Sequence, residues 1–371
     1  MTRPLLDVSG LSVSFDTYEG RHDVLNGVDL TVDEGETVAL VGETGCGKSV
    51  TARSIMGTLP RPPGDITAGE IHYDGTNLLS DKGAHERVKG DEMSMIFQDP
   101  MTYLSPVYPV GSMMADVATY SGGKNASWWD VLKNLLGRRE NNAEIRERSI
   151  ELLDRMRIPD PEGALDRYPV ELSGGMRQRV IIAMALINNP EFLIADEPTT
   201  ALDVTVQNQI LDLLRERVEE RNLSMLYITH NLGVAREIAD RICIMYAGEI
   251  VEVGRTKEIF DDPLHPYTRG LLDSIPKLTG FDGTGIDGQI PDYTDPPSGC
   301  RFHPRCPAAM EGTCDVDPVD EYQVGGNRAV ACHLYDDGMG FDEAEAIASD
   351  EANYQDDDEQ RPAEVGAGGD T

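Results

Sequence analysis

The stretch that decides the fold is GETGCGKS, which runs from Gly42 to Ser49. It fits the pattern G-x-x-x-x-G-K-[ST] without a mismatch, and the glycines of this pattern let consecutive backbone N–H groups point at phosphate oxygens. The apolar run 37–41 precedes it, and the helix-like segment 49–57 follows it. A phosphate-binding loop requires this order of strand, glycine loop and helix, which disfavours a chance glycine turn.

The same stretch supplies the candidate nucleotide ligands. Lys48 brings a positive charge to the β- and γ-phosphates, and the hydroxyl of Ser49 suits Mg²⁺. Cys46 is expected to serve there only as a small residue. The predicted nucleotide-binding set is Gly42, Glu43, Thr44, Gly45, Cys46, Gly47, Lys48, Ser49 and Val50.

A second motif is FLIADE, residues 192–197, in which an apolar strand ends in two acids. Ligands of open α/β sheets bind at the carboxyl ends of the strands, so these acids lie where a phosphate site is expected. Asp196 is predicted to hold Mg²⁺, and Glu197 to polarise the attacking water. An apolar strand that ends in two acids is common in proteins, so by itself it indicates little. The phosphate loop upstream makes a catalytic role for this strand end the better interpretation. The alternation of strands and helices predicts a mainly parallel, doubly wound sheet.

The segment LSGGMRQR, residues 172–179, resembles the signature of ATP-binding cassette (ABC) ATPases. Gln98 is placed like the family's Q-loop glutamine, Asp203 like its D-loop aspartate and His230 like its switch histidine. A histidine alone would more often be a surface or core residue, but the motifs follow one another in the family's order. The resemblance covers residues 1 to about 255.

This resemblance implies an α/β P-loop NTPase fold: a RecA-like core with antiparallel β and α-helical subdomains, the helical one spanning about residues 99–176. It implies ATP hydrolysis with Mg²⁺ held by Ser49, Gln98 and Asp196, and catalytic roles for Glu197, His230 and Gln98. In the family, the signature closes over the ATP of a partner chain. The residues carried over for that contact are Ser173, Gly174, Gly175 and Gln178, with Asp203 in the D-loop.

Adenine needs an aromatic or apolar face to stack on, and the family uses an aromatic residue near the first strand. Phe15 matches that position by eye, but Tyr18 is close, and Phe15 could equally be strand core. Both stay candidates.

Finer resemblance points to oligopeptide and dipeptide importer ATPases. It is carried by the stretches from Gln98 to Pro106 and from Ile194 to Gln207, by THNLGV (229–234) and MYAG (245–248), and by HPYT (265–268). The chain departs from the subgroup at Tyr103, Ser105 and Asn231, and in an insertion around Trp128 and Trp129.

This subgroup implies a cassette domain at 1–255 and a small Cys-containing extension at 256–335. Composition predicts an acidic, disordered tail at 336–371. It implies a related second cassette chain, forming a heterodimer, two permease subunits and an external solute-binding protein, with no nucleic acid partner. The helical region, about residues 99–170, is expected to face the permeases at the cytoplasmic side of the membrane. Nickel complexes or sugars are alternative cargoes. A soluble ABC ATPase of DNA repair or translation, and a regulatory protein with a dead site, are weaker alternatives.

Four cysteines crowd into the extension: Cys300, Cys306, Cys314 and Cys332. GCRFHPRCP and VACHL match extensions of dipeptide-type ATPases, some of which carry an iron–sulfur cluster there. Four thiolates can ligate [4Fe–4S] or Zn²⁺, but the absence of a C-x₂-C pair weakens zinc. Reduced structural thiols or adventitious disulfides are the alternatives. Cys243 is expected in the core.

Lys and Arg total 32 while Asp and Glu total 66, which gives a net charge of −34. This balance argues against a protein that coats nucleic acid or an anionic membrane, because both need a positive field. The acidity extends beyond the tail, so a halophilic source is a hypothesis, since high salt screens self-repulsion. There is no apolar run long enough to span a membrane and no signal-peptide pattern, which favours the cytoplasm.

Overall fold

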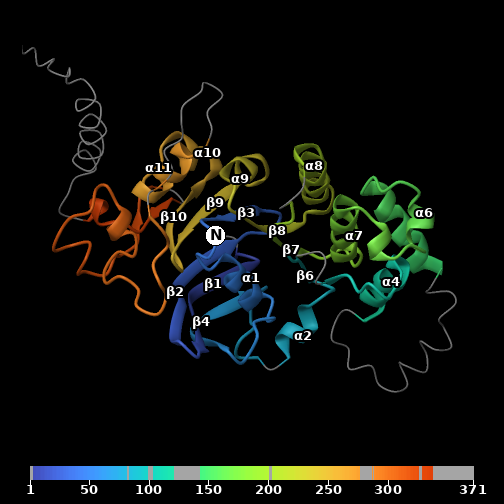
Figure 1. The fold of residues 1–371 in the computed structure, drawn as a ribbon, viewed down its shortest axis with the longest axis horizontal. Coiled ribbons are helices and arrows are strands. Elements are labelled where there is room, and N and C mark those ends of the chain that lie inside the picture. Colours follow the sequence, from blue (N-terminus) through green and yellow to red (C-terminus); the bar gives the residue numbers. More distant parts are fainter. Residues whose placement is uncertain are drawn as a thin grey trace, which may run out of the picture.

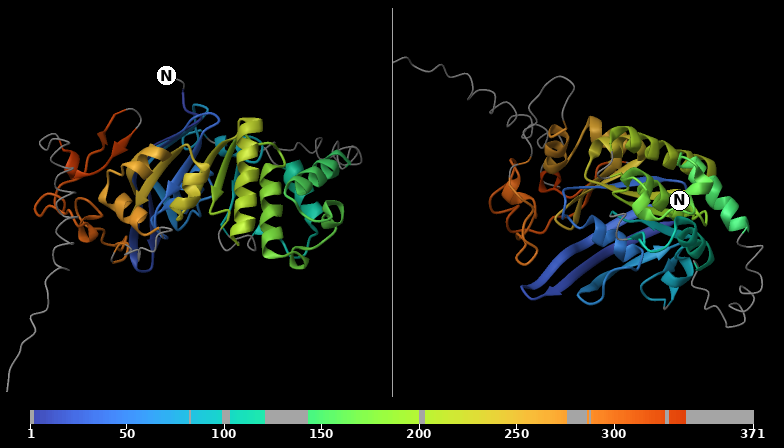
Figure 2. Two further views of the ribbon diagram at one scale, coloured as in Figure 1. Left: turned by 90° about the horizontal axis from the view of Figure 1, so that it is seen from above. Right: turned by 45° about the vertical axis from the view of Figure 1, so that its right-hand side comes forward.

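The computed structural model describes residues 3–81, 83–98, 103–120, 143–199, 203–275, 286, 288–325 and 328–336. These residues form two β-sheets with helices around them (Figure 1). A lobe of helices lies at one end of the molecule, and the C-terminal extension lies at the opposite end (Figures 1 and 2).

The larger sheet has eight strands in the order β11-β12-β10-β9-β3-β8-β7-β6. Its centre is parallel, as predicted, because β3 pairs in parallel with β8 and β9, and β7 pairs in parallel with β8 and β6. The strands of this parallel part are β3 (Thr37–Val41), β6 (Met93–Ile96), β7 (Phe192–Asp196), β8 (Ser224–Thr229) and β9 (Arg241–Tyr246).

Central strands are buried on both faces, which explains their continuous apolar runs. In β7, Phe192 and Ile194 pack with α1 (Lys48–Ile55) and the smaller sheet. Leu193 and Ala195 instead pack with α7 (Gly174–Leu186) and α8 (Val204–Arg221). Side chains alternate between the two faces of a strand, so this one short segment joins two separate cores.

The smaller sheet is antiparallel, with the order β2-β1-β4-β5. Its strands are β1 (Leu6–Thr17), β2 (Gly20–Val32), β4 (Gly64–Tyr73) and β5 (Thr76–Asn77), and α2 (Ala84–Val88) follows them. The antiparallel β subdomain that the resemblance implies is thus present. The β1–β2 hairpin extends beyond the larger sheet toward the C-terminal extension (Figure 1).

The helical lobe contains α4 (Val110–Tyr120), a helix at 143–155, α6 (Pro161–Ala164), the 3₁₀ turn η1 (Pro169–Glu171) and α7. Its buried apolar side chains form one core with β7 and β8. The predicted helical character of this region is confirmed for the part that is described. The insertion with Trp128 and Trp129 lies outside the described residues.

Helix α9 (Leu232–Ile238) precedes β9. After β9 come β10 (Glu249–Arg255), α10 (Thr256–Asp261), α11 (Pro266–Asp273), η2 (His303–Arg305), β11 (Tyr322–Gln323), β12 (Ala329–Val330) and η3 (His333–Tyr335). Strand β12 pairs antiparallel with β10, so the extension contributes strands to the cassette's own sheet. The boundaries at 255 and 335 stay predictions, and residues 337–371 of the acidic tail lie outside the described part. Within that part, no helix is long and apolar enough to cross a bilayer.

Candidate functional site

The glycine loop runs from the end of β3 into the start of α1, as the sequence predicts. Gly47 caps α1 in the left-handed region at φ 110°, where a side chain would be strained. Gly42 has no room for a Cβ atom, because that atom would collide with the carbonyl oxygen of Met245 on β9. The loop therefore needs glycine for its curvature and for its close approach to β9.

The ammonium group of Lys48 lies inside the curve of this loop. It donates hydrogen bonds of 2.8 Å to the carbonyl oxygens of Gly42 and Glu43. Lys48 is 4% exposed, so its charge is focused in a small volume of low dielectric. This is a local positive site in a chain of strongly negative net charge.

Ser49 and Asp196 come from different parts of the chain and meet at the end of the sheet. The Ser49 hydroxyl donates to Asp196 Oδ1 at 3.2 Å. Burial raises the pKa of Asp196 above its ordinary value, and the hydrogen bond from Ser49 opposes that rise. A hydroxyl and a carboxylate are oxygen ligands of the kind that Mg²⁺ prefers, so their chemistry fits a magnesium site.

Glu197 joins two further predicted residues. Its Oε2 accepts a hydrogen bond of 3.0 Å from Gln98, and its Oε1 lies 3.1 Å from His230 Nδ1. Glu197 is 7% exposed and adopts φ 47°, an unusual conformation for a residue with a side chain. The structure thus brings Gln98, Glu197 and His230 together next to Asp196, as the motif order implies.

The signature residues do not join this cluster. The Ser173 side chain caps its own helix, α7, by accepting from Met176 N at 3.3 Å. Gly174 is open to solvent, whereas Gln178 is buried and donates to the carbonyl of Pro198. Helix α7 belongs to the helical lobe and α1 to the core (Figure 1).

Asp203 likewise acts locally as a helix cap. Its carboxylate accepts from Val206 N at 3.0 Å at the start of α8. The preceding residues 200–202 of the predicted D-loop lie outside the described part.

The two adenine candidates differ in environment. Phe15 is half-buried near the end of β1, and its ring lies against Gly64 of β4. Tyr18 lies at the β1–β2 turn with its side chain fully exposed. Phe15 is held by its packing against the core beneath it, whereas Tyr18 has no such support within the described residues.

Sequence reasoning missed three residues that contact the glycine loop from the extension. Tyr267 accepts a hydrogen bond from Glu43 N, Tyr293 donates one to Gly45 O, and Arg305 pairs with the Glu43 carboxylate. The HPYT motif, which includes Tyr267, was the available signal, but nothing in the sequence states which loop it would reach.

Among the described residues, the four cysteines of the extension form no disulfide. Cys300 N donates to Cys314 O at 2.8 Å. Burial raises the pKa of Cys332 to about 12, and the nearby thiols of Cys300, Cys306 and Cys314 add to this rise. In the described residues, no three His, Cys, Asp or Glu side chains lie where they could hold one metal ion. A preformed zinc site therefore does not fit. A [4Fe–4S] cluster is bound through four separate irons, so its thiolates need not converge on one point.

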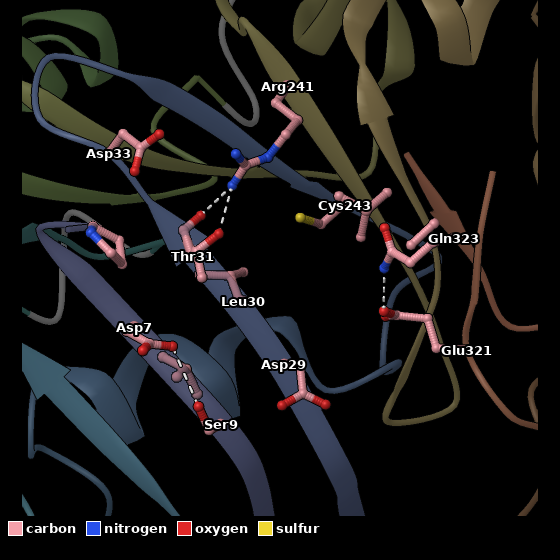
Figure 3. A pocket seen from close by; sticks show the side chains of 14 residues that line it. Asp7, Ser9, Asp29, Leu30, Thr31, Asp33, Arg241, Cys243, Glu321 and Gln323 are labelled. Carbon is pink, nitrogen blue, oxygen red and sulfur yellow. Dashed lines mark hydrogen bonds between the residues drawn. The ribbon is translucent and has the colours of Figure 1, made fainter. Parts of the chain in front are cut away.

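A cavity of about 480 Å³ lies away from the glycine loop (Figure 3). Its wall carries Asp7, Asp29, Asp33 and Glu321, together with Arg241, whose guanidinium donates to Thr31. None of the predicted nucleotide ligands lines it. The cavity is therefore separate from the candidate site.

Comparison with known proteins agrees with this geometry. A family model described as ABC transporter matches residues 25–200, and one described as Oligopeptide/dipeptide transporter, C-terminal region, matches residues 251–314. The chain is 46% identical to the Oligopeptide transport ATP-binding protein OppD of Bacillus subtilis, over 85% of this chain and 84% of that protein. This chain belongs to the ABC transporter ATP-binding family.

Two further relatives support the assignment. The Dipeptide transport ATP-binding protein DppD of Bacillus subtilis is 46% identical over 90% of this chain and 95% of that protein. Among solved structures, a dimeric post-hydrolysis state of the ATP-binding cassette MJ0796 bound to ADP and Pi covers 68% of this chain and 98% of that one. Its TM-score is 0.57 at 26% identity. The ABC cassette fold and the ATPase activity of the family, both expected from the motifs, are confirmed for this chain.

Proposed function

We propose that this chain is the ATP-hydrolysing subunit of a dipeptide or oligopeptide importer. The observation that carries the ATPase assignment is the cluster at the end of the sheet, where Ser49 meets Asp196 and where Glu197 meets both Gln98 and His230. The peptide assignment rests on relatives that are named for oligopeptide and dipeptide transport and on the matching C-terminal region.

In this proposal, Lys48 and backbone N–H groups of the loop other than those of Glu43 and Cys46 hold the β- and γ-phosphates. Ser49, Gln98 and Asp196 provide the oxygen ligands for Mg²⁺, which when bound neutralises charge on the phosphates. Glu197 orients and polarises the attacking water, and His230 fixes the Glu197 carboxylate while facing the γ-phosphate. Phe15 is the favoured adenine platform because packing holds its ring in place.

Each site is completed by a second cassette chain. Ser173, Gly174 and Gly175 stand at the start of α7, whose N-terminal N–H groups and dipole suit an anion. Gly174 faces solvent in this single chain, which leaves the helix start accessible to the γ-phosphate of a partner. Gln178 supports the signature from inside through Pro198, and Asp203 fixes the start of α8. A related chain, giving a heterodimer, is the proposed partner.

The helical lobe is the proposed permease-facing surface. Tyr103, Val107 and Tyr108 are exposed between Gln98 and α4, and Tyr168 and Val170 are exposed just before the signature. Large apolar side chains gathered at a surface suit a protein partner. Because this surface follows Gln98 directly, a permease that contacts it can influence the hydrolytic cluster. A chain with this role works at the cytoplasmic face of the membrane.

The experiment is purification of the tagged full-length chain from its own membranes, followed by reconstitution of the captured complex in vesicles. Two permeases and a second cassette chain are expected, with ATP hydrolysis stimulated by the peptide-loaded solute-binding protein. Stimulation by a nickel complex or a sugar alone would contradict the peptide assignment. Tyr108→Asp should reduce permease capture, whereas Val316→Asp, at an equally exposed site in the extension, should not. Capture without any membrane subunit would favour a soluble ABC ATPase.

The cysteines of the extension are proposed ligands of a [4Fe–4S] cluster: Cys300, Cys306, Cys314 and Cys332. The supporting observations are that the four cysteine thiols are neighbours and that their sequence context resembles that of the subgroup. Protein purified without oxygen should absorb near 400 nm and contain about four irons per chain. Cys306→Ser should lose both signals. Zinc at one per chain, or no metal at all, would contradict the cluster.

The net charge of −34 supports a further proposal, that the chain works at high intracellular salt. Its melting temperature should rise between dilute buffer and molar KCl, because screening removes self-repulsion among carboxylates. Full stability in dilute buffer with no gain in KCl would contradict it.

A further inference from the structure

The C-terminal extension contacts the glycine loop at two residues, Glu43 and Gly45. The Glu43 N–H donates a hydrogen bond of 3.0 Å to the Tyr267 hydroxyl. The Tyr293 hydroxyl donates one of 2.8 Å to the carbonyl oxygen of Gly45. Arg305 lies 3.2 Å from the Glu43 carboxylate. Residues separated from the loop by more than 200 positions therefore fix three of its polar groups.

Tyr267 is itself held firmly. It is fully buried, and its ring packs edge-on against Tyr246 of β9 at 4.7 Å between centroids and beside Phe302 at 5.3 Å. Its backbone N–H donates to His265 Nδ1 at 3.0 Å, and the backbone N–H of His265 donates to Glu252 on β10 at 2.9 Å. The HPYT motif thus connects strand β10 to the phosphate loop through an unbroken series of hydrogen bonds.

Tyr293 is fixed from the other side. Its carbonyl oxygen accepts a hydrogen bond of 3.2 Å from Asp23 N on β2, so this stretch of the extension lies along the β1–β2 hairpin. The Tyr293 backbone is therefore tied to β2, while its hydroxyl reaches the carbonyl oxygen of Gly45.

These contacts matter because the loop must bind phosphate with its N–H groups. Gly45 and Gly47 have φ values of 91° and 110°. Glycine adopts these values readily, but a glycine-rich segment that nothing holds also samples many other conformations. Lys48 holds the carbonyls of Gly42 and Glu43 from inside the curve. Tyr293 holds the Gly45 carbonyl from outside. The Glu43 N–H is used by Tyr267 and the Cys46 N–H by the Glu43 carbonyl, so phosphate binding falls to other N–H groups of the loop.

We propose that Tyr267 and Tyr293 of the extension are positioning residues that pre-organise the phosphate loop for nucleotide binding. Ordering the loop before the ligand arrives reduces the entropic cost of binding. The extension therefore sets the affinity of the site for the phosphate groups of ATP and ADP. This inference rests on the assignment of residues 42–50 to phosphate binding.

The test uses the full-length chain and a fluorescent ATP analogue, with MgADP and inorganic pyrophosphate as competitors. Tyr267→Phe and Tyr293→Phe remove only a hydroxyl, and each should weaken both competitors about three- to tenfold. The double variant should bind more weakly than either single variant. Tyr73→Phe is the matched control, since its hydroxyl bonds to the carbonyl of Glu92 away from the loop, and it should bind as the wild type does.

Pyrophosphate has neither base nor ribose, so it separates this proposal from a contact to those parts of the nucleotide. Weakened ADP binding with unchanged pyrophosphate binding would show a contact to the base or ribose and would overturn it. Unchanged affinity for both competitors in the double variant would also overturn it, as would equal weakening in Tyr73→Phe. Lys48→Ala tests the site itself: if it leaves pyrophosphate binding intact, the assignment of the loop fails. If Lys48→Ala abolishes binding and the tyrosine variants do not weaken it, only the pre-organisation fails.

Discussion

The side-chain amide of Gln98 donates a hydrogen bond of 3.0 Å to the carboxylate of Glu197. Gln98 follows β6 and Glu197 follows β7, and these two strands are parallel neighbours in the sheet. Parallel strands end at the same edge, so residues far apart in sequence meet there. The residue that leads into the proposed permease-facing surface is thereby joined directly to the residue proposed to activate water.

Glu197→Gln should separate binding from hydrolysis. The amide keeps the size of the side chain but cannot polarise water, so hydrolysis should fall at least a hundredfold while ATP affinity stays within about threefold. Phosphate release and nucleotide binding measure the two effects, and chromatography with ATP should show a trapped dimer. Glu219→Gln changes an exposed carboxylate on α8 and serves as the control. Undiminished hydrolysis in Glu197→Gln would remove this residue from its proposed role.

Asp196→Asn should make the nucleotide-free chain more stable. Burial raises the pKa of Asp196, so the ionised carboxylate destabilises the folded chain at neutral pH. This cost falls as the carboxylate is protonated and is absent below the ordinary pKa of aspartate. Near pH 7 the neutral amide should raise the melting temperature by about 2 °C, while Mg²⁺-dependent hydrolysis is lost. The gain should shrink toward pH 4.

Asp116→Asn, at an exposed site on α4, is the control for a change of net charge. If it stabilises the chain equally, the effect belongs to the overall negative charge. A melting temperature that falls in Asp196→Asn would contradict the role given to burial.

Ser173 allows its helix cap to be separated from its proposed contact with a partner's ATP. Ser173→Ala should cost about 1 kcal/mol of unfolding free energy, because Met176 N loses its acceptor. Ser173→Asn should retain that stability, since asparagine is an equally good cap. Both variants should bind ATP as single chains yet lose ATP-dependent dimerisation and hydrolysis. Normal ATP turnover in Ser173→Asn would show that Ser173 only caps its helix and does not contact the ATP of a partner chain.

The buried imidazole of His265 should make the free energy of unfolding depend on pH. Complete burial and the nearby charge of Arg269 lower its pKa to about 3, so the folded chain keeps it neutral while the unfolded chain protonates it near pH 6.5. The stability from this neutral form is present above pH 6.5 and is lost as pH falls toward 3. The loss approaches about 1.4 kcal/mol per pH unit for one proton.

His265→Asn keeps an acceptor for the Tyr267 N–H but cannot titrate. Urea unfolding at pH 7.5, 6.0 and 5.0 in constant KCl should therefore show a flatter pH dependence in this variant than in the wild type. His72→Asn, a partly exposed histidine on β4, should leave the slope unchanged. Parallel curves for wild type and His265→Asn would refute the buried neutral histidine.

The sequence predicted those parts of the site that depend on local patterns. GETGCGKS gives the loop because glycine spacing and flanking apolar runs are local properties, and FLIADE places two acids at a strand end for the same reason. The meeting of Gln98, Glu197 and His230 could be expected only through the resemblance, since no local rule states which strands are neighbours. The contacts of Tyr267 and Tyr293 with the loop were missed because they depend on tertiary packing across the whole chain.

The pairing of β12 with β10 bears on any attempt to cut the chain to its cassette. Ending the protein at residue 255 would leave the backbone groups of Glu252 and Val253 without the partners that Ala329 and Val330 provide. A bare sheet margin of this kind recruits strands from other molecules, so such a fragment should aggregate rather than behave as a minimal enzyme.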